Sequence, residues 1–318
     1  MKSYTPNIDI LENRLRTRGR VLDILLRDRT TGRNIIWATD SYAGRGREFD
    51  SKRQIKPELV TGVNGRLIQP RASKSREEQK NRTKDKAEVF TPLKIVGEMN
   101  KAVDWASKNW PVGDDNWQDY VNELRLEITC GEAPFIAGRY NPTADTGAII
   151  KPHNRVGFLD RKLQIVAKFT TSKKEWLHWA EAALKSSYGY EWQGDNLLIA
   201  RENILQTMDD FYRDKFGGER GLSTEQLEHF AEIISWNIWQ MDGIKCVVPM
   251  SCKATVQKDV IDKNQMALFA PEKPKKVIIE CPGCRTGDHA QHTGRYSKIM
   301  DWRKGKTIRF IDVVNGNS

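Results

Sequence analysis

The stretch that decides the fold reads Leu126-Glu127-Ile128-Thr129-Cys130-Gly131-Glu132-Ala133-Pro134-Phe135. Residues 124–128 predict a buried strand that ends at the Cys130-Gly131 turn. Glycine permits a tight turn there, after which backbone N–H groups can face a ligand. Because ligands of open parallel sheets bind beyond the carboxyl ends of the strands, this loop is a candidate binding site.

Segments around this loop alternate between helix and strand signals. Thr91 as N-cap and Pro92 at the first helical position predict a helix over residues 93–99. Further helices are expected over 175–185, over 196–211 and from Ser223, and further strands over 188–191 and within 233–242. Such alternation predicts an α/β protein with a mostly parallel, doubly wound sheet.

The chain before residue 87 differs in character. Residues 20–26 fit either a strand or the start of a helix, residues 30–34 carry a turn signal, and residues 34–39 predict a strand. Together they predict a hairpin in a small β-rich N-terminal module. Residues 73–86 are expected to form a polar helix.

Composition bounds the class of protein. The chain has 318 residues, a net charge of +10 and a pI of about 9.3, which permits a polyanionic partner. No window approaches ~18 consecutive apolar residues, and the start of the chain lacks the apolar core of a signal peptide. Five cysteines do not suggest a disulfide framework, so we expect a reducing, cytoplasmic location.

Basic residues concentrate between residues 66 and 86. A run this dense can neutralise several phosphates, which gives salt-dependent affinity for DNA of any sequence. A solvated helix or linker is the alternative. The candidate DNA-binding residues are Arg71, Lys74, Arg76, Lys80, Arg82 and Lys84.

The stretch from Leu126 to Phe135 resembles the cofactor loop of adenine-N6 and related amino-methyltransferases, usually acidic-Pro-Ala-Cys-Gly-x-Gly-x-Phe. Ile128 and Thr129 replace Pro-Ala here, and Ala133 replaces the second glycine. From about residue 88 to 245 the chain also resembles methylase subunits of restriction–modification systems. The resemblance implies a Rossmann-like methyltransferase sheet, S-adenosylmethionine as cofactor, DNA as substrate and a cognate restriction subunit as a partner.

Three more segments match in order and spacing. Residues 89–92 resemble the segment that covers the methionine moiety of the cofactor. Glu191 stands where a carboxylate binds the ribose hydroxyls, Trp192 where a side chain packs on adenine, and Asp242 where an acid accepts from the adenine amine. The implied cofactor-binding residues are Phe90, Thr91, Pro92, Glu127, Thr129, Cys130, Gly131, Glu132, Pro134, Phe135, Glu191, Trp192 and Asp242.

The resemblance also suggests a division of the chain. Residues 1–86 would form the N-terminal module and basic stretch, and residues 87–314 the methyltransferase-like domain. The distance from Glu127 to Glu191 exceeds what one strand–helix–strand unit needs, so residues 139–187 are interpreted as an insertion. It could cover the cofactor, touch DNA, or consist of ordinary packed helices.

The family's catalytic tetrapeptide is absent. Adenine-N6 enzymes use Asn or Asp followed by Pro-Pro and an aromatic residue to hold the target amine and stack on the flipped base. The best surrogate by position is Asp301 followed by Trp302, at the end of an expected strand. A strand end with a packed tryptophan is the alternative interpretation.

A cluster of cysteine and histidine follows within residues 278–295. Cys281, Cys284, His289 and His292 are two thiols and two imidazoles, the ligand set of a closed tetrahedral zinc site. The short spacing predicts a structural, knuckle-like insertion near the C-terminus. Free thiols and surface histidines are the alternative.

A short segment within the linker-like residues 254–275 resembles the peptide that docks on the bacterial replication sliding clamp. It reads Gln265-Met266-Ala267-Leu268-Phe269, where the clamp peptide has Gln-Leu-x-Leu-Phe. A simple packing segment is the alternative.

The sequence therefore predicts two alternative functions. The first is a DNA methyltransferase that transfers a methyl group to adenine N6. The second is a catalytically altered relative that keeps cofactor binding and serves in DNA recognition or regulation.

Overall fold

A parallel sheet of three strands lies at the centre of the computed structural model, which describes residues 15–86, 88–143, 148–218, 220–258 and 276–316. The strands are β1 (Arg125–Glu127), β2 (Ser187–Glu191) and β3 (Ile238–Gln240), in the order β1-β2-β3. Leu126 pairs with Tyr188, and Tyr190 with Trp239. The three predicted strands therefore exist, and their carboxyl ends meet at one edge.

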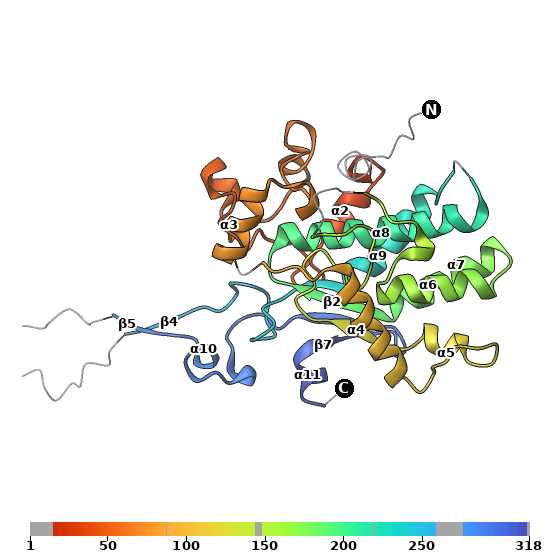
Figure 1. The fold of residues 1–318 in the computed structure, drawn as a ribbon. Coiled ribbons are helices and arrows are strands. Elements are labelled where there is room, and N and C mark those ends of the chain that lie inside the picture. Colours follow the sequence, from red (N-terminus) through yellow and green to blue (C-terminus); the bar gives the residue numbers. More distant parts are fainter. Residues whose placement is uncertain (1–14, 87, 144–147, 219, 259–275, 317–318) are drawn as a thin grey trace, which may run out of the picture.

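Helices connect these parallel strands and cover the sheet (Figure 1). The connecting helices are α6 (Phe158–Phe169) and α7 (Lys173–Lys185) between β1 and β2, and α8 (Gly194–Phe216) and α9 (Thr224–Asn237) between β2 and β3. Before β1 come α4 (Leu93–Ala106) and α5 (Trp117–Val121). α9 begins as predicted, since the side chains of Ser223 and Gln226 each accept from the other's backbone N–H. α4 begins one residue later than expected, with Pro92 rather than Thr91 at its N-cap.

The segment interpreted as an insertion contains the packed helices α6 and α7. α6 and α7 bury apolar side chains at helical spacing, among them Leu159, Leu163, Trp176 and Ala180, in the main hydrophobic cluster. Buried residues from both sides of the predicted boundary at residue 86, such as Trp37 and Leu198, belong to this same cluster.

The β-rich N-terminal module was a wrong prediction. Residues 15–86 contain the helices α2 (Val21–Leu26) and α3 (Arg76–Lys86) and the 3-10 turns η1 (Ala43–Arg45), η2 (Arg47–Phe49), η3 (Pro57–Leu59), η4 (Gly62–Asn64) and η5 (Arg71–Ser73), with only isolated bridges. The turn before Asn34 does form, and the Ile35 N–H donates to the Leu26 C=O across it. The extended segment after it forms no regular ladder: the Gln240 side chain takes both backbone groups of Ile36, and Ala38 has φ +50°.

Two short antiparallel pairs complete the fold. β4 (Thr255–Lys258) pairs with β5 (Lys276–Ile279) in a ribbon that projects from the helical body (Figure 1). β6 (Lys298–Asp301) pairs with β7 (Lys306–Arg309), followed by α11 (Phe310–Val314). Near the ribbon lie α10 (Pro282–Thr286) and η8 (His289–Gln291), and η6 (Pro152–Asn154) precedes α6. A second apolar cluster, which includes Tyr190, Trp239 and Phe310, joins β6, β7 and α11 to the sheet.

The protein is thus a mixed α/β fold with a small parallel sheet. The wider doubly wound sheet that we expected does not appear in the described residues, since β1 stands at the edge. The strand that ends at the binding loop was predicted to be buried, yet its Leu126 is exposed. None of the described helices combines the length and apolar character that a membrane span needs.

A buried arginine, Arg201, links α8 to the segments on either side of it by hydrogen bonds. Arg201 of α8 donates to the carbonyl groups of Leu25, Arg27, Ser235 and Ile238. We expect Arg201→Met to lower the free energy of unfolding by about 3–5 kcal/mol, because these buried acceptors lose their charged donor.

Urea unfolding followed by circular dichroism measures the effect. Lys80→Met, at an exposed position of α3, is the control and should stay within about 0.5 kcal/mol of the parent. An Arg201→Met protein as stable as this control would contradict the assignment.

Candidate functional site

A cavity of about 880 Å³ opens at the carboxyl ends of β1 and β2. Its walls come from residues 88–91, from α4, from the loop after β1 and from the start of α8. The structure brings most of the predicted cofactor residues to this one cavity: Phe90, Thr91, Glu127, Thr129, Cys130, Gly131, Pro134, Phe135, Glu191 and Trp192.

The loop after β1 is held in a demanding backbone conformation. Gly131 has φ +54°, and a Cβ there would lie 3.3 Å from the Phe90 ring. Thr129 and Ala133 also adopt left-handed φ values, +49° and +63°, which cost energy for residues with side chains. The amide of Asn203 in α8 steadies the loop by donating to the carbonyl groups of Glu132 and Ala137, both at 3.2 Å.

Two carboxylates, those of Glu127 at the end of β1 and Glu191 at the end of β2, line the cavity. Glu191 accepts from the N–H of Gly131 at 2.8 Å and from that of Gln193 at 3.0 Å. Burial raises the pKa of Glu191 to about 6, although these N–H groups act in the opposite direction.

Burial also raises the pKa of Glu127, and the charge of Glu191 adds to that rise. The Oε2 atom of Glu127 is buried and has no hydrogen-bond partner among the described residues. A carboxylate oxygen without a partner at a cavity wall is suited to a ligand that donates hydrogen bonds or carries positive charge.

A buried charge network fixes the segment that leads into the cavity. Arg82 of α3 donates to Glu88 at 2.6 Å and to Asp195 at 2.8 Å, and Asn196 donates to Glu88 at 2.7 Å. Tyr42 donates to Asp195 at 2.9 Å. Despite burial, Arg82 keeps the pKa values of Glu88 and Asp195 below their usual range. Sequence reasoning missed this network, because its members lie far apart along the chain.

Three predicted cofactor residues lie outside the cavity. Pro92 caps α4. Glu132 is buried behind the loop, where it accepts from the backbone of Arg71 and from Tyr140. Asp242 closes a turn by accepting from the N–H groups of Ile244 and Lys245, so its carboxylate is engaged away from the cavity.

The surrogate catalytic pair lies on a different surface. Asp301 accepts from the backbone N–H groups of Arg303 and Lys304, and the Trp302 indole donates to Asn237 at 2.7 Å. Both line a second hollow of about 660 Å³ rather than the cavity at Gly131. This arrangement fits the alternative interpretation, in which residues 301 and 302 are a strand end with a packed tryptophan.

The candidate DNA-binding residues divide into two groups. Arg76, Lys80 and Lys84 are exposed along α3, and Arg71 is half-buried with its guanidinium over the Phe90 ring. Arg82 and Lys74 are buried, so neither can reach a phosphate without unfolding. Their charge is needed inside the protein, where Arg82 pairs with Glu88 and Asp195, and Lys74 lowers the pKa of both acids.

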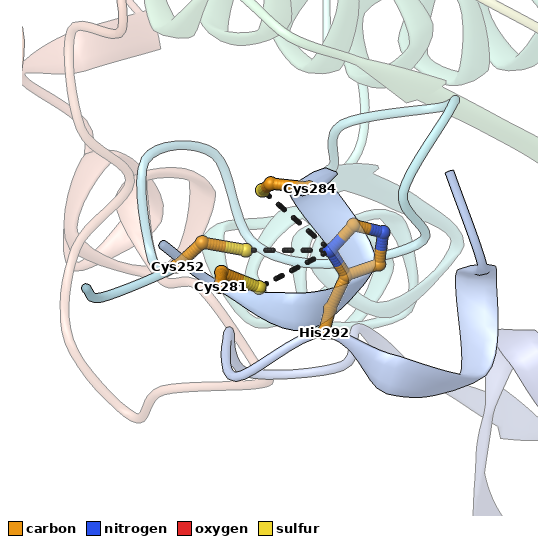
Figure 2. Close-up of side chains that lie close together, drawn as sticks. All are labelled: Cys252, Cys281, Cys284 and His292. Carbon is orange, nitrogen blue, oxygen red and sulfur yellow. Dashed lines mark hydrogen bonds between the residues drawn. The ribbon is translucent and has the colours of Figure 1, made fainter. Parts of the chain in front are cut away.

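A metal-ligand cluster lies at the base of the β4–β5 ribbon. Cys252, Cys281, Cys284 and His292 have ligand atoms that all lie within 4.8 Å of one another (Figure 2). The Nδ1 atom of His292 is 3.7, 3.6 and 3.7 Å from the three sulfurs in that order. Tetrahedral ligands at ~2.3 Å (sulfur) and ~2.05 Å (nitrogen) from zinc stand about 3.6 Å apart, so the cluster has the dimensions of a closed zinc site.

The three thiols lie close together, and their pKa values differ. Against the effect of burial, hydrogen bonds from Thr293 and its neighbours lower the pKa of Cys281 to about 5. Burial and the other two thiols raise that of Cys252 to about 12. Gly283 is required by close packing, since a Cβ there would lie 2.7 Å from Nδ1 of His292. The cluster can hold a metal such as zinc.

The cluster differs from the predicted ligand set at one position. His289 lies in the exposed turn η8 and is outside the group, and Cys252 takes its place. Cys252 is far upstream of Cys281, so a search for closely spaced ligands could not find it.

The clamp-like peptide, residues 265–269, lies outside the described residues. Comparisons with family models, curated proteins and solved structures found no match to this chain.

The metal cluster makes a testable prediction about its fourth ligand. Protein purified without added zinc should contain about one zinc ion per chain by mass spectrometry of the metal. Cys252→Ser should reduce this content and lower the melting temperature, because a structural ion contributes to folding.

His289→Ala is the matched control and should leave both the zinc content and the melting temperature unchanged. The opposite pattern, with zinc lost from His289→Ala and kept by Cys252→Ser, would restore the ligand set expected from the sequence.

Proposed function

We propose that this chain binds S-adenosylmethionine in the cavity at Gly131 and transfers its methyl group to adenine N6 in DNA. The observation that carries this proposal is the hydrogen bond from the N–H of Gly131 to Glu191, in a cavity where Oε2 of Glu127 has no hydrogen-bond partner among the described residues. The proposal gains support from the cavity walls, which combine carboxylates with apolar side chains such as Phe90 and Phe135. A nucleoside joined to an amino acid requires such a mixture.

The two acids would divide the binding of the cofactor between them. Glu191 is hydrogen-bonded to two backbone N–H groups and still has lone pairs for the ribose hydroxyls. Glu127 would accept from the cationic amino group, because that charge offsets the cost of its burial. Phe90, whose ring would lie 3.3 Å from a Cβ at position 131, would cover the amino-acid end.

S-adenosylmethionine, when bound, supplies an electrophilic methyl group on its sulfonium. Glu191 and Glu127 would hold the cofactor so that this methyl group could pass from sulfur to the adenine N6 nitrogen, which would lose a proton. The protein's task is to exclude water, orient the acceptor and hold it near the methyl group. Exposed Arg76, Lys80 and Lys84 of α3 would contact phosphates, with no sequence preference of their own.

A second candidate function is favoured by one observation. Asp301 and Trp302 are engaged on another surface, and the sequence has no Asn/Asp-Pro-Pro-aromatic tetrapeptide. A cofactor-binding relative that recognises DNA without transferring a methyl group would have this arrangement. A cognate restriction subunit would suit either function as a partner.

Cofactor binding predicts a defined pH dependence. With a pKa of about 6, Glu191 is ionised above that pH and accepts hydrogen bonds fully; below it, one oxygen is protonated and acceptance weakens. Affinity for S-adenosylmethionine should therefore fall as pH decreases from 7.5 to 5. Glu191→Gln should raise the dissociation constant at pH 7.5 about tenfold or more and weaken this pH dependence, part of which remains through Glu127, whose pKa is also raised by burial.

Isothermal titration calorimetry on folded protein measures both effects. Asp242→Asn is the control, because Asp242 lies outside the cavity, and it should bind like the parent. No heat of binding for the parent protein at any pH would end the proposal.

Methyl transfer itself separates the two candidate functions. The parent should transfer tritium from labelled S-adenosylmethionine to duplex DNA, and digestion should yield N6-methyladenine. Gly131→Val should abolish transfer, because its side chain would collide with Phe90 in the position the cofactor needs. Cofactor binding without transfer would instead support the non-catalytic relative.

A further inference from the structure

Gln193 is a cavity residue whose side chain has no role in the contacts described so far. It lines the same cavity as Glu191 and follows that residue by two positions. Its Oε1 atom is buried and has no hydrogen-bond partner among the described residues. A buried amide oxygen without a partner is costly, and a ligand that donates a hydrogen bond to it removes that cost.

We propose that Gln193 recognises the adenine base of the cofactor by pairing its side-chain amide with the exocyclic amine and a neighbouring ring nitrogen. The pairing rests on the proposed function and names the residue that selects adenine over other bases. An amide suits this role because it presents an acceptor and a donor side by side, as adenine does along its edge. An ionised carboxylate could accept from the amine but could not donate to the ring nitrogen.

Gln193 lies close to the residue that would hold the ribose. Its backbone N–H donates to Oε1 of Glu191 at 3.0 Å, at the end of β2. In the proposed function Glu191 accepts from the ribose hydroxyls, and the base is bonded to that same ribose. Gln193 has extended backbone, and two residues of extended chain span about 7 Å, so its side chain can reach the base.

The side chain of Gln193 is not needed by the helix that it precedes. It stands at the N-cap of α8 and makes no capping hydrogen bond to that helix. Short polar side chains are preferred at an N-cap because they accept from the first backbone N–H groups, and this glutamine does not. Gln193 is half-buried and the torsion of its terminal amide is soft, so the amide can turn toward a bound base.

Two other candidates for the adenine amine are committed elsewhere. Asn196 lines the cavity, but its amide donates to Glu88 at 2.7 Å and accepts from Arg82 at 3.4 Å. Asp242, the acceptor expected from the sequence, closes a turn outside the cavity with its carboxylate. Gln193 is therefore better placed than either residue to accept from the base.

Trp192, between Glu191 and Gln193, gives the base an apolar surface. Its indole N–H donates to the Ala38 carbonyl group at 2.8 Å, which holds the ring in place at the cavity wall. Stacking on an aromatic ring tolerates any base, because every base has a π-face. Selection of adenine then depends on the hydrogen bonds of Gln193.

Two ligands that differ only in the amine test this assignment. S-adenosylhomocysteine, the cofactor without its methyl group, and its deamino analogue, with hydrogen in place of the amine, are titrated into full-length protein by calorimetry. The parent should bind the amino ligand about tenfold more tightly, because the analogue leaves the buried amide oxygen unpaired. Gln193→Met keeps a similar length without hydrogen-bonding groups, so its two dissociation constants should agree within about twofold.

Control variants separate this effect from a general loss of binding or of folding. Glu191→Gln should weaken both ligands to the same extent, because both carry the same ribose, and should keep the preference for the amine. Asp242→Asn should bind both ligands like the parent. Gln193→Met should melt within about 2 °C of the parent, since the side chain makes no hydrogen bond among the described residues that the change would break.

Failure of this assignment and failure of the proposed function give different results. A parent that binds neither ligand would reject both. A parent that binds the two ligands equally, or a Gln193→Met protein that keeps the tenfold preference, would reject only the role of Gln193. Loss of the preference in Asp242→Asn would return the amine to Asp242.

Discussion

The hydrogen bonds that join the ends of β1 and β2 are the constraint on which the rest of the site depends. Cys130 N–H donates to Tyr190 C=O at 2.8 Å, and Gly131 N–H donates to the Glu191 carboxylate at the same distance. These two bonds turn the chain sharply after β1 and force left-handed backbone at Gly131. A buried carboxylate is thereby held at the mouth of a cavity, where its desolvation is offset by backbone donors.

The buried charges around Arg82 extend this constraint to the N-terminal part of the chain. α3 contains exposed cations suited to phosphate, and on its other side Arg82 reaches Glu88 and Asp195. Glu88 lines the cavity, and Asp195 is the second residue of α8. α3 is therefore joined by ion pairs to the wall of the cavity at Gly131. Breaking one partner of such a buried pair is costly, which makes this connection stiff.

The metal cluster and the edge strand β1 show that some parts of a site can be predicted from local sequence and others cannot. Cys281 and Cys284 are close in sequence, and their spacing alone indicated a knuckle turn. The fourth ligand depended on where the chain after β3 returns, and that path brought Cys252 rather than His289. In the same way, residues 124–128 predicted a buried strand, and only the fold showed that β1 stands at the sheet edge with Leu126 exposed.

The sequence by itself determined the local elements and the order of the site segments. Periodicity predicted α7, α8, α9 and the strands, and the Gly131 turn marked the loop, because these features depend on residues within a few positions of one another. Tertiary structure alone decided the rest. Asp242 and Glu132 left the cavity, Arg82 became buried, the extended segment at Ile36 gave its hydrogen bonds to Gln240, and β1 stayed at the edge. Each outcome depends on which distant groups compete for the same donor, acceptor or buried space, and that competition is settled only when the chain is folded.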